Sequence, residues 1–263
     1  MTTATPARTS SVPARTTLAA LTGLEARLLV REWAPMLFAF VFPPMMMLVL
    51  AGVFANDGGA AYGGADATDY YIAAYLGVPL AALALMGLPT ALAGYRERGV
   101  LRRFEASGLS LTAVVCAQAL VTAGLIVLAA GLVLAVAAPV YGLPELRDPV
   151  GVALGFALGT AAMLSLGVVL GLLARTARSA QALGLLVFLP MWLRGGGGPP
   201  PSVMTDVMQQ IAGALPMTHV TDVVRDAWLG TGEIGRPLAL TAVWLVVGLV
   251  LCAWLLRRRP DRV

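Results

Sequence analysis

Six long apolar blocks, separated by short polar or charged segments, dominate the pattern of this sequence. A helix needs about 20 consecutive apolar residues to cross the hydrocarbon core of a bilayer. The pattern therefore predicts an all-α membrane protein with six transmembrane helices, forming one domain over 18–256 between polar tails at 1–17 and 257–263. The predicted spans are 35–54, 70–94, 111–140, 150–173, 180–193 and 237–256.

A different pattern precedes the first span. Leucines recur at helical spacing over 18–33, while charged side chains favour the other side, which predicts an amphipathic helix lying in the membrane interface. The alternative is a charged lead-in to the first span. The segment before it, 1–17, has no apolar region and no cleavage site of the secretory type. The charged residues of the predicted interfacial helix are Glu25, Arg27, Arg31 and Glu32.

Two spans carry unusual features. The first contains Pro43 and Pro44, which predict a bend at a packed or cavity-lining position. The fifth provides fourteen uncharged residues before Arg194, a length of only about 21 Å. A run of glycines and prolines follows, and the amphipathic stretches 203–215 and 217–229 then predict a re-entrant helical hairpin in the outer leaflet, between spans five and six. Tyrosines at the start of the second span, Tyr70, Tyr71 and Tyr75, are expected to form an interfacial aromatic belt.

Composition and charge agree with this topology. Of the 263 residues, 59% are hydrophobic and 12% charged, whereas soluble domains average roughly 45–50% and about 25%. With both termini in the cytoplasm, the inner segments hold fourteen of the eighteen basic residues and the outer segments hold nine of the fourteen acidic ones. This satisfies the positive-inside rule. A five-span alternative would place the arginines of 257–259 outside.

Several kinds of chemistry are excluded by residue type. All eighteen basic residues are arginines, and a P-loop requires a lysine, so we expect no ATP hydrolysis by this chain and no enzymatic role. A single histidine, His219, cannot build a multi-histidine metal site, and it is expected to be an ordinary polar residue. No ionisable residue lies well inside a span, which disfavours ion-coupled transport. An antiporter would need Glu32 or Asp69 within the hydrocarbon. Transport driven by a separate subunit fits best.

The inner loop at 95–110 is the most informative segment. Its charges alternate with apolar side chains, as in a short amphipathic helix with one exposed aromatic, and such a surface suits docking onto a soluble partner. The alternative is an ordinary positive-inside loop. The candidate docking residues are Arg96, Glu97, Arg98, Leu101, Arg102, Arg103, Phe104 and Glu105.

The motifs and their order resemble the permease subunit of a type-2 ABC exporter, the family that includes actinobacterial antibiotic-resistance permeases of the daunorubicin type. The resemblance covers nearly the whole chain. It rests on Phe-Pro-Pro in the first span, on the Arg-Glu-Arg-Gly to Leu-Ser loop, and on the Gly-Pro-rich and Leu-Pro-Met-Thr segments before and within the hairpin. Arg194 stands where a serine is usual, and Ser107 and Gly108 stand where Thr-Pro is common.

This resemblance implies a homodimer, or a pair with a similar permease, in a bacterial cell membrane. Two copies of a separate ATPase would supply ATP and Mg and would contact the inner loop, while the hairpin would lie at the outer mouth. No cofactor in this chain and no nucleic-acid partner are expected, and membrane lipids would surround the spans. The alternative function is a non-transporting anchor or signalling subunit of an ABC-type ATPase complex, although the outer segments are too short for a folded sensory domain.

Spans one, two and five are expected to line the cargo route. Its wall would be apolar, rich in methionine and uncharged, which suits a drug, a natural product or a lipid-like molecule better than a sugar or an ion. The alternative for each methionine is that it fills a gap in the core. The candidate residues of this path are Phe42, Met46, Met86, Phe188 and Met191.

Overall fold

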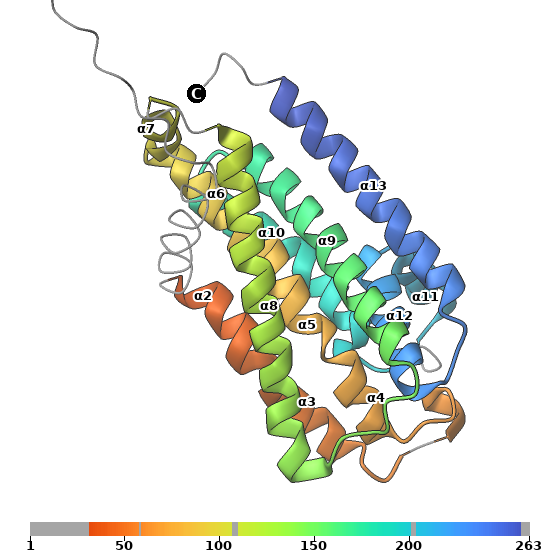
Figure 1. Ribbon diagram of the computed structural model, residues 1–263. Helices are drawn as coiled ribbons and strands as arrows, with labels where there is room; N and C mark the ends of the chain where they lie inside the picture. Colours follow the sequence, from red (N-terminus) through yellow and green to blue (C-terminus); the bar gives the residue numbers. More distant parts are fainter. Residues whose placement is uncertain (1–31, 58, 107–109, 201–203, 259–263) are drawn as a thin grey trace, which may run out of the picture.

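The computed structural model describes residues 32–57, 59–106, 110–200 and 204–258, which form helices without any strand. Figure 1 shows the long helices packed side by side as one bundle. In chain order the elements are α2 Trp33–Met36, the π-helical turn η1 Leu37–Val41, α3 Phe42–Val53, the 3-10 turn η2 Gly59–Tyr62, α4 Ala67–Ala74, α5 Gly77–Ala82, the π-helical turn η3 Leu83–Gly87, α6 Leu88–Glu97, α7 Val100–Ala106, α8 Leu111–Tyr141, α9 Pro149–Leu173, α10 Ala177–Trp192, the π-helical turn η4 Leu193–Gly197, α11 Asp206–Gly213, α12 Pro216–Leu229 and α13 Gly235–Arg257.

Five helical segments within the described residues are long and apolar enough to cross a membrane. They are Trp33–Val53, Ala67–Glu97, Leu111–Tyr141, Pro149–Leu173 and Gly235–Arg257. The prediction of an all-α membrane protein is confirmed. The predicted fifth span corresponds to α10, which has 16 residues and continues into η4. Six crossings of the membrane therefore remain a prediction.

The bend expected in the first span takes the form of a π-helical turn. η1 immediately precedes Pro43 and Pro44, both of which are buried. Proline has no backbone N–H and its ring clashes with the preceding turn, so a wider turn at this point relieves the helix. The same pairing recurs where η3 precedes Pro89.

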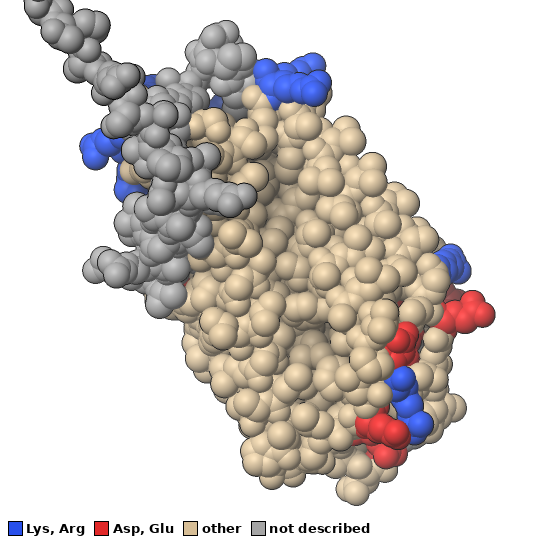
Figure 2. Space-filling model, viewed as in Figure 1, with Lys and Arg blue, Asp and Glu red and all other residues tan. Residues whose placement is uncertain are grey.

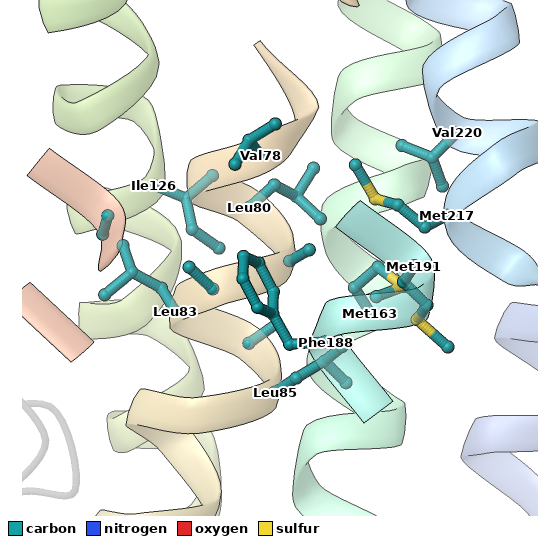
Figure 3. Close-up of a cluster of buried hydrophobic side chains, with 14 of the residues drawn as sticks. Val78, Leu80, Leu83, Leu85, Ile126, Met163, Phe188, Met191, Met217 and Val220 are labelled. Atoms are coloured by element: carbon teal, nitrogen blue, oxygen red, sulfur yellow. The ribbon is translucent and has the colours of Figure 1, made fainter. Parts of the chain in front are cut away.

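The segment from α4 to α6 is the centre of the bundle. Its most apolar stretch is buried throughout by the other helices, and Figure 3 shows Leu80, Leu83 and Leu85 of this segment beside Phe188. The prediction of an interfacial aromatic belt is wrong, because this segment lies inside the bundle. Tyr70, Tyr71 and Tyr75 are 5%, 0% and 0% exposed because the rings face neighbouring helices instead of the lipid headgroups.

Glycines on α9 allow this close packing. A Cβ added at Gly155 or Gly159 would meet Val223 or Val220 of α12, and one added at Gly167 would meet the backbone of Ala84. Small residues spaced four apart let membrane helices approach closely, and the packing of their backbones then stabilises the pair. α9 is therefore held between α12 on one side and the central segment on the other.

The two ends of the bundle differ in charge. Figure 2 shows arginines at the end that carries α7 and the C-terminal end of α13, and acidic side chains interspersed with arginines toward the opposite end, with a broad uncharged surface between them. The exposed arginines of α7 and of the α9–α10 turn lie at the first of these ends. This distribution agrees with the asymmetry used to predict cytoplasmic termini.

Candidate functional site

The inner loop folds as a short helix fixed to the end of the bundle. After α6, Gly99 adopts a φ of +67°, a left-handed conformation that glycine tolerates easily, and α7 begins at Val100. Leu101 is buried and packs with Tyr95 and Val114. Phe104 is half-buried, with its ring 6.4 Å from that of Tyr95. The sequence predicts one exposed aromatic here, whereas Phe104 keeps only part of its surface exposed because it also packs on Tyr95.

Arg96 and Glu97 bind the turn between α9 and α10. Arg96 Nη1 donates to the carbonyl oxygens of Leu172 at 3.2 Å and Ala174 at 2.7 Å. Glu97 Oε2 accepts from the backbone N–H of Ala177 at 2.9 Å. A cation at a helix C-terminus and an anion at a helix N-terminus both complement the helix dipole, each by about 0.3–1 kcal/mol. We name these two residues and the turn that they hold, 174–177, the inner clamp.

The remaining docking candidates have different positions. Arg98, Arg102 and Arg103 are exposed around α7 and form a basic surface beside the inner clamp. Glu105 belongs to α7, but its side chain lies outside the described residues. The structure therefore divides the predicted set into residues that fix α7 and residues that project from it.

The predicted interfacial helix lies almost entirely outside the described residues, and so do Glu25, Arg27 and Arg31. Glu32 is described, and its carbonyl accepts from the backbone N–H of Met36 at 3.3 Å at the start of the first span.

An aromatic cluster connects the first long segment, Trp33–Val53, to α10 and includes two of the predicted path residues. Phe42 lies 5.3 Å from Trp192, and Phe38 lies 5.4 Å from Phe42 and 5.8 Å from Phe188, measured between ring centroids. Such pairs contribute about 0.5–1.5 kcal/mol each beyond their buried area. We call Phe38, Phe42, Phe188 and Trp192 the aromatic cluster.

The five predicted path residues differ in burial. Met86 and Phe188 are 1% and 0% exposed, and Met191 is also buried. Within one chain these three side chains belong to the apolar core, in which Figure 3 shows Phe188 and Met191. Phe42 and Met46 are only partly buried. The cargo path therefore stays a prediction.

Carbonyl groups of the glycine run after α10 accept hydrogen bonds from side-chain hydroxyl groups. The hydroxyl of Thr221 donates to the Gly195 carbonyl at 2.9 Å, that of Tyr75 to Gly197 at 3.3 Å, and that of Tyr71 to Gly198 at 3.5 Å. The last carbonyls of a helix have no partner within the helix, and here side chains of α4, α12 and the α4–α5 junction supply one. The fifth span is thereby fastened to the centre of the bundle and to the hairpin.

The hairpin after this run consists of α11 and α12. α12 is amphipathic, and its apolar side chains Val220, Val223 and Val224 are buried, as the sequence predicts. Its C-terminal carbonyls at Ala227 and Trp228 accept from the backbone N–H groups of Asp148 and Arg147, both at 3.0 Å. α12 is therefore tied to the α8–α9 loop as well as to α9.

Arg225 of α12 is the centre of an ionic network far from the end of the bundle that carries α7. Its side chain is 12% exposed and forms ion pairs of 2.9 Å with Asp222 and Asp226. It also donates to the Tyr70 hydroxyl at 3.3 Å, with the guanidinium carbon 4.9 Å from the Tyr70 ring centroid. Burial alone would lower the pKa of Arg225, but the two carboxylates outweigh burial and raise it. The network borders a cavity of about 250 Å³ that also contacts Tyr62 and Thr231.

A comparison with known families identifies the chain. Residues 16–229 match the family described as ABC-2 type transporter. The chain belongs to this family. The match spans the first four of the five long apolar segments, the inner loop, α10 and both hairpin helices, and it ends before α13. It confirms the resemblance to an ABC-2 type permease. No curated protein matches this sequence significantly.

Membership makes the protein the permease subunit of an ABC-type transporter, a multi-pass membrane component that is not itself catalytic. The family also implies an ABC ATPase as partner. Among the described residues of this ABC-2 permease, no group of three or more His, Cys, Asp or Glu side chains is arranged to hold a metal ion.

Sequence reasoning missed the inner clamp and the ionic network of the ABC-2 permease. The loop predicts that Arg96 and Glu97 face a partner, but these residues bond to backbone groups about 80 positions further along the chain, which no local pattern indicates. Arg225 has a weak local signal, because Asp222 precedes it by three positions on an amphipathic helix. Its pairing with Tyr70, from a distant helix, has none.

Proposed function

We propose that this permease is the membrane half of an ATP-driven exporter for hydrophobic or amphipathic small molecules. It would act as a homodimer in a bacterial cell membrane, with both termini cytoplasmic, and two copies of a separate ABC ATPase would bind the end that carries α7. The observation that carries this proposal is the inner clamp, which fixes the end of α6, directly before α7, to the start of α10 while leaving Arg98, Arg102 and Arg103 exposed.

The clamp offers a physical route for coupling. A force on α7 reaches the start of α10 through Glu97, since Glu97 caps that helix at Ala177. α10 contacts the first span through Phe188 and Trp192, and its end is bonded to Thr221 of the hairpin. Packed helices transmit displacement because they have a few discrete arrangements. ATP-driven movement of α7 would thus shift both the aromatic cluster and the outer hairpin.

Apolar surfaces along the same helices favour an amphipathic cargo. A groove of about 540 Å³ beside η1 is lined by Trp33, Phe40 and Leu125 among other apolar residues, and a cavity of about 130 Å³ between α10 and α11 is lined by Met204, Met208 and neighbours. Apolar and methionine-rich walls accommodate hydrophobic molecules of varied shape. Movement of the aromatic cluster would join such surfaces to Phe42 and Met46.

The test is reversal of charge on α7 in vesicles that contain the permease and its ATPase. Arg102→Glu combined with Arg103→Glu should weaken ATPase binding and reduce stimulated ATP hydrolysis by about tenfold, because interface charges of the wrong sign cost several kcal/mol. Arg257→Glu combined with Arg258→Glu makes the same change of charge at the end of α13 and should have less than a twofold effect. Equal loss from both pairs would contradict docking at α7.

Cargo movement separates the exporter from the alternative, a non-transporting anchor or signalling subunit. ATP-dependent accumulation of a fluorescent amphiphile in inverted vesicles is expected for the exporter. Retained ATPase binding and stimulation without net movement of amphiphiles or labelled lipids would favour the alternative.

A further inference from the structure

The cavity beside Arg225 shares no lining residue with α7 or with the predicted cargo path. It has a volume of about 250 Å³ and is bordered by η2, α4, α12 and the turn after α12. Its polar side chains come from Tyr62, Tyr70, Arg225, Asp226 and Thr231.

The ionic network that borders this cavity is negative overall, although only Arg225 and Asp226 of its charged residues line the cavity itself. Arg225 is paired with both Asp222 and Asp226, and its Nη1 group donates a hydrogen bond to the Tyr70 hydroxyl. Two carboxylates thus face one guanidinium, which leaves one negative charge in excess. An anion would meet this excess charge and an arginine most of whose donors are engaged, so the network favours a cation in the adjoining cavity.

Asp226 has an oxygen available for such a cation. Within the part of the chain that the structure describes, the hydrogen bonds to this carboxylate from Arg225 Nε and Thr231 Oγ1 end on Oδ1, at 2.9 and 3.2 Å. An ionised carboxylate accepts on both oxygens, and Oδ2 is therefore the acceptor that remains.

Aromatic rings complete the wall and select the kind of cation. Tyr62 is buried and packs edge-on against Tyr70, with ring centroids 5.4 Å apart. The guanidinium of Arg225 lies over the Tyr70 ring. An aromatic ring of this cavity wall therefore already contacts one organic cation, the side chain of Arg225. Aromatic faces bind organic ammonium groups well, whereas a small metal ion requires several oxygen ligands.

From this geometry we propose that the cavity binds the ammonium group of a small organic cation, held between the Tyr62 ring and Asp226 Oδ2. The volume is sufficient for a trimethylammonium or similar alkylammonium group. The proposal goes beyond export, because binding requires neither the ATPase nor net transport. The ammonium group can belong to a free amine or to a lipid headgroup, since both present the same chemistry.

The test uses choline as the probe and the full-length permease in a maltoside detergent without amines. Saturation-transfer NMR should detect choline with a Kd on the order of 1 mM, as expected for so few atoms. Dimethylbutanol, the neutral carbon isostere of choline, should bind at least about fivefold more weakly because it lacks the charge. Equal signals from the two molecules would overturn the proposal, as would competition by sodium ions at the concentration of choline.

Variants locate the site. Asp226→Asn keeps the shape and the acceptor for Arg225 but removes the charge, and it should weaken choline binding by about tenfold. Asp206→Asn, an exposed acidic residue on α11 outside the cavity, is the matched control and should change binding less than twofold. Unchanged binding by a folded Asp226→Asn variant would refute the site.

Tyr62 provides a second test that does not touch the ionic network. Tyr62→Phe keeps the ring and should bind choline within about twofold of the original, while Tyr62→Leu removes the ring face and should lose about fivefold. If Asp226→Asn does not fold, equal binding by Tyr62→Leu and the original would reject the proposal. Displacement of choline by phosphatidylethanolamine would assign the site to a lipid headgroup, and its absence would assign it to a free cation.

Discussion

Arg96 and Glu97 are adjacent in the sequence, yet they bond to opposite ends of two successive helices. Arg96 satisfies carbonyls at the C-terminus of α9, at Leu172 and Ala174, and Glu97 satisfies the N–H of Ala177 at the N-terminus of α10. The pair spans one tight turn with the charge order that the two helix dipoles favour. α7, the proposed docking helix, starts three residues after Glu97 and is therefore positioned by this turn.

Loss of Glu97 should release the start of α10. In Glu97→Ala, the N–H of Ala177 loses its carboxylate acceptor, and we expect a destabilisation of about 1 kcal/mol, typical of a lost helix cap. Hydrogen exchange should accelerate at 174–177. The exposed residue Arg102 of α7 gives the control, since Arg102→Ala should leave exchange in this turn unchanged. Slow exchange in Glu97→Ala would show that Thr176 and Ser179, which also cap α10, are sufficient.

The close approach of α9 to the central segment predicts a strong effect of a single methyl group. A Cβ at Gly167 would meet the carbonyl oxygen of Ala84, which belongs to the backbone and cannot rotate away. Gly167→Ala should therefore destabilise the protein by about 1–3 kcal/mol, the usual cost of overpacking. This would appear as a lower midpoint of thermal unfolding in detergent.

The control for Gly167 lies on α8. Gly124 is also within a long apolar helix, but nothing lies within 4 Å of a Cβ built there. Gly124→Ala should be neutral or slightly stabilising, because alanine favours the helix by roughly 0.8–1.0 kcal/mol over glycine. Equal effects of the two substitutions would mean that α9 does not pack against η3 as described.

The sequence was sufficient for the helical class and for most helix positions, because uncharged blocks of membrane length have few other structures available. It also predicted α11 and α12, since the run of glycines and prolines ends α10 and the apolar face of α12 has helical spacing. The membership in the ABC-2 family followed from motif order. These features depend on local pattern.

Interactions between distant segments could not be predicted in the same way. Tyr71 and Tyr75 resemble an interfacial belt by position, but they face inward because the glycine carbonyls after α10 need donors. Phe104 resembles an exposed docking residue, but Tyr95 lies one helix away and covers part of its ring. In each case the deciding partner lies on another helix, and the amphipathic pattern does not specify it.

Burial of His219 predicts a dependence of stability on pH. Desolvation lowers the pKa of His219 in the folded protein, although Asp222 partly opposes this. The unfolded chain, with a pKa near 6.5, then binds more protons than the folded chain at mildly acidic pH. Stability is therefore full above about pH 6.5 and falls as the pH decreases toward the lowered pKa. His219 is the single histidine of the chain, so the effect can be isolated by one substitution.

The measurement is the midpoint of thermal unfolding between about pH 7.5 and 5.5, a range in which other side chains with ordinary pKa values titrate little. The midpoint should fall as the pH is lowered in the original protein, and His219→Gln should show a flatter profile. Identical profiles would contradict preferential burial of the neutral imidazole.

The hydroxyl of Thr221 should matter more than its location on the hairpin suggests. It is buried and donates to the Gly195 carbonyl at 2.9 Å, so Thr221→Val leaves a carbonyl at the end of α10 without this donor while keeping the side-chain shape. An unsatisfied buried acceptor costs about 1–3 kcal/mol. Thr241→Val is the matched control, because Thr241 is equally buried but donates to Pro237 within its own helix, where that carbonyl also belongs to the helical ladder. If α10 is fastened to α12 through Gly195, Thr221→Val should lower the unfolding midpoint and slow ATP-dependent transport, whereas Thr241→Val should do neither; similar behaviour of the two variants would remove this contact from the proposed coupling route.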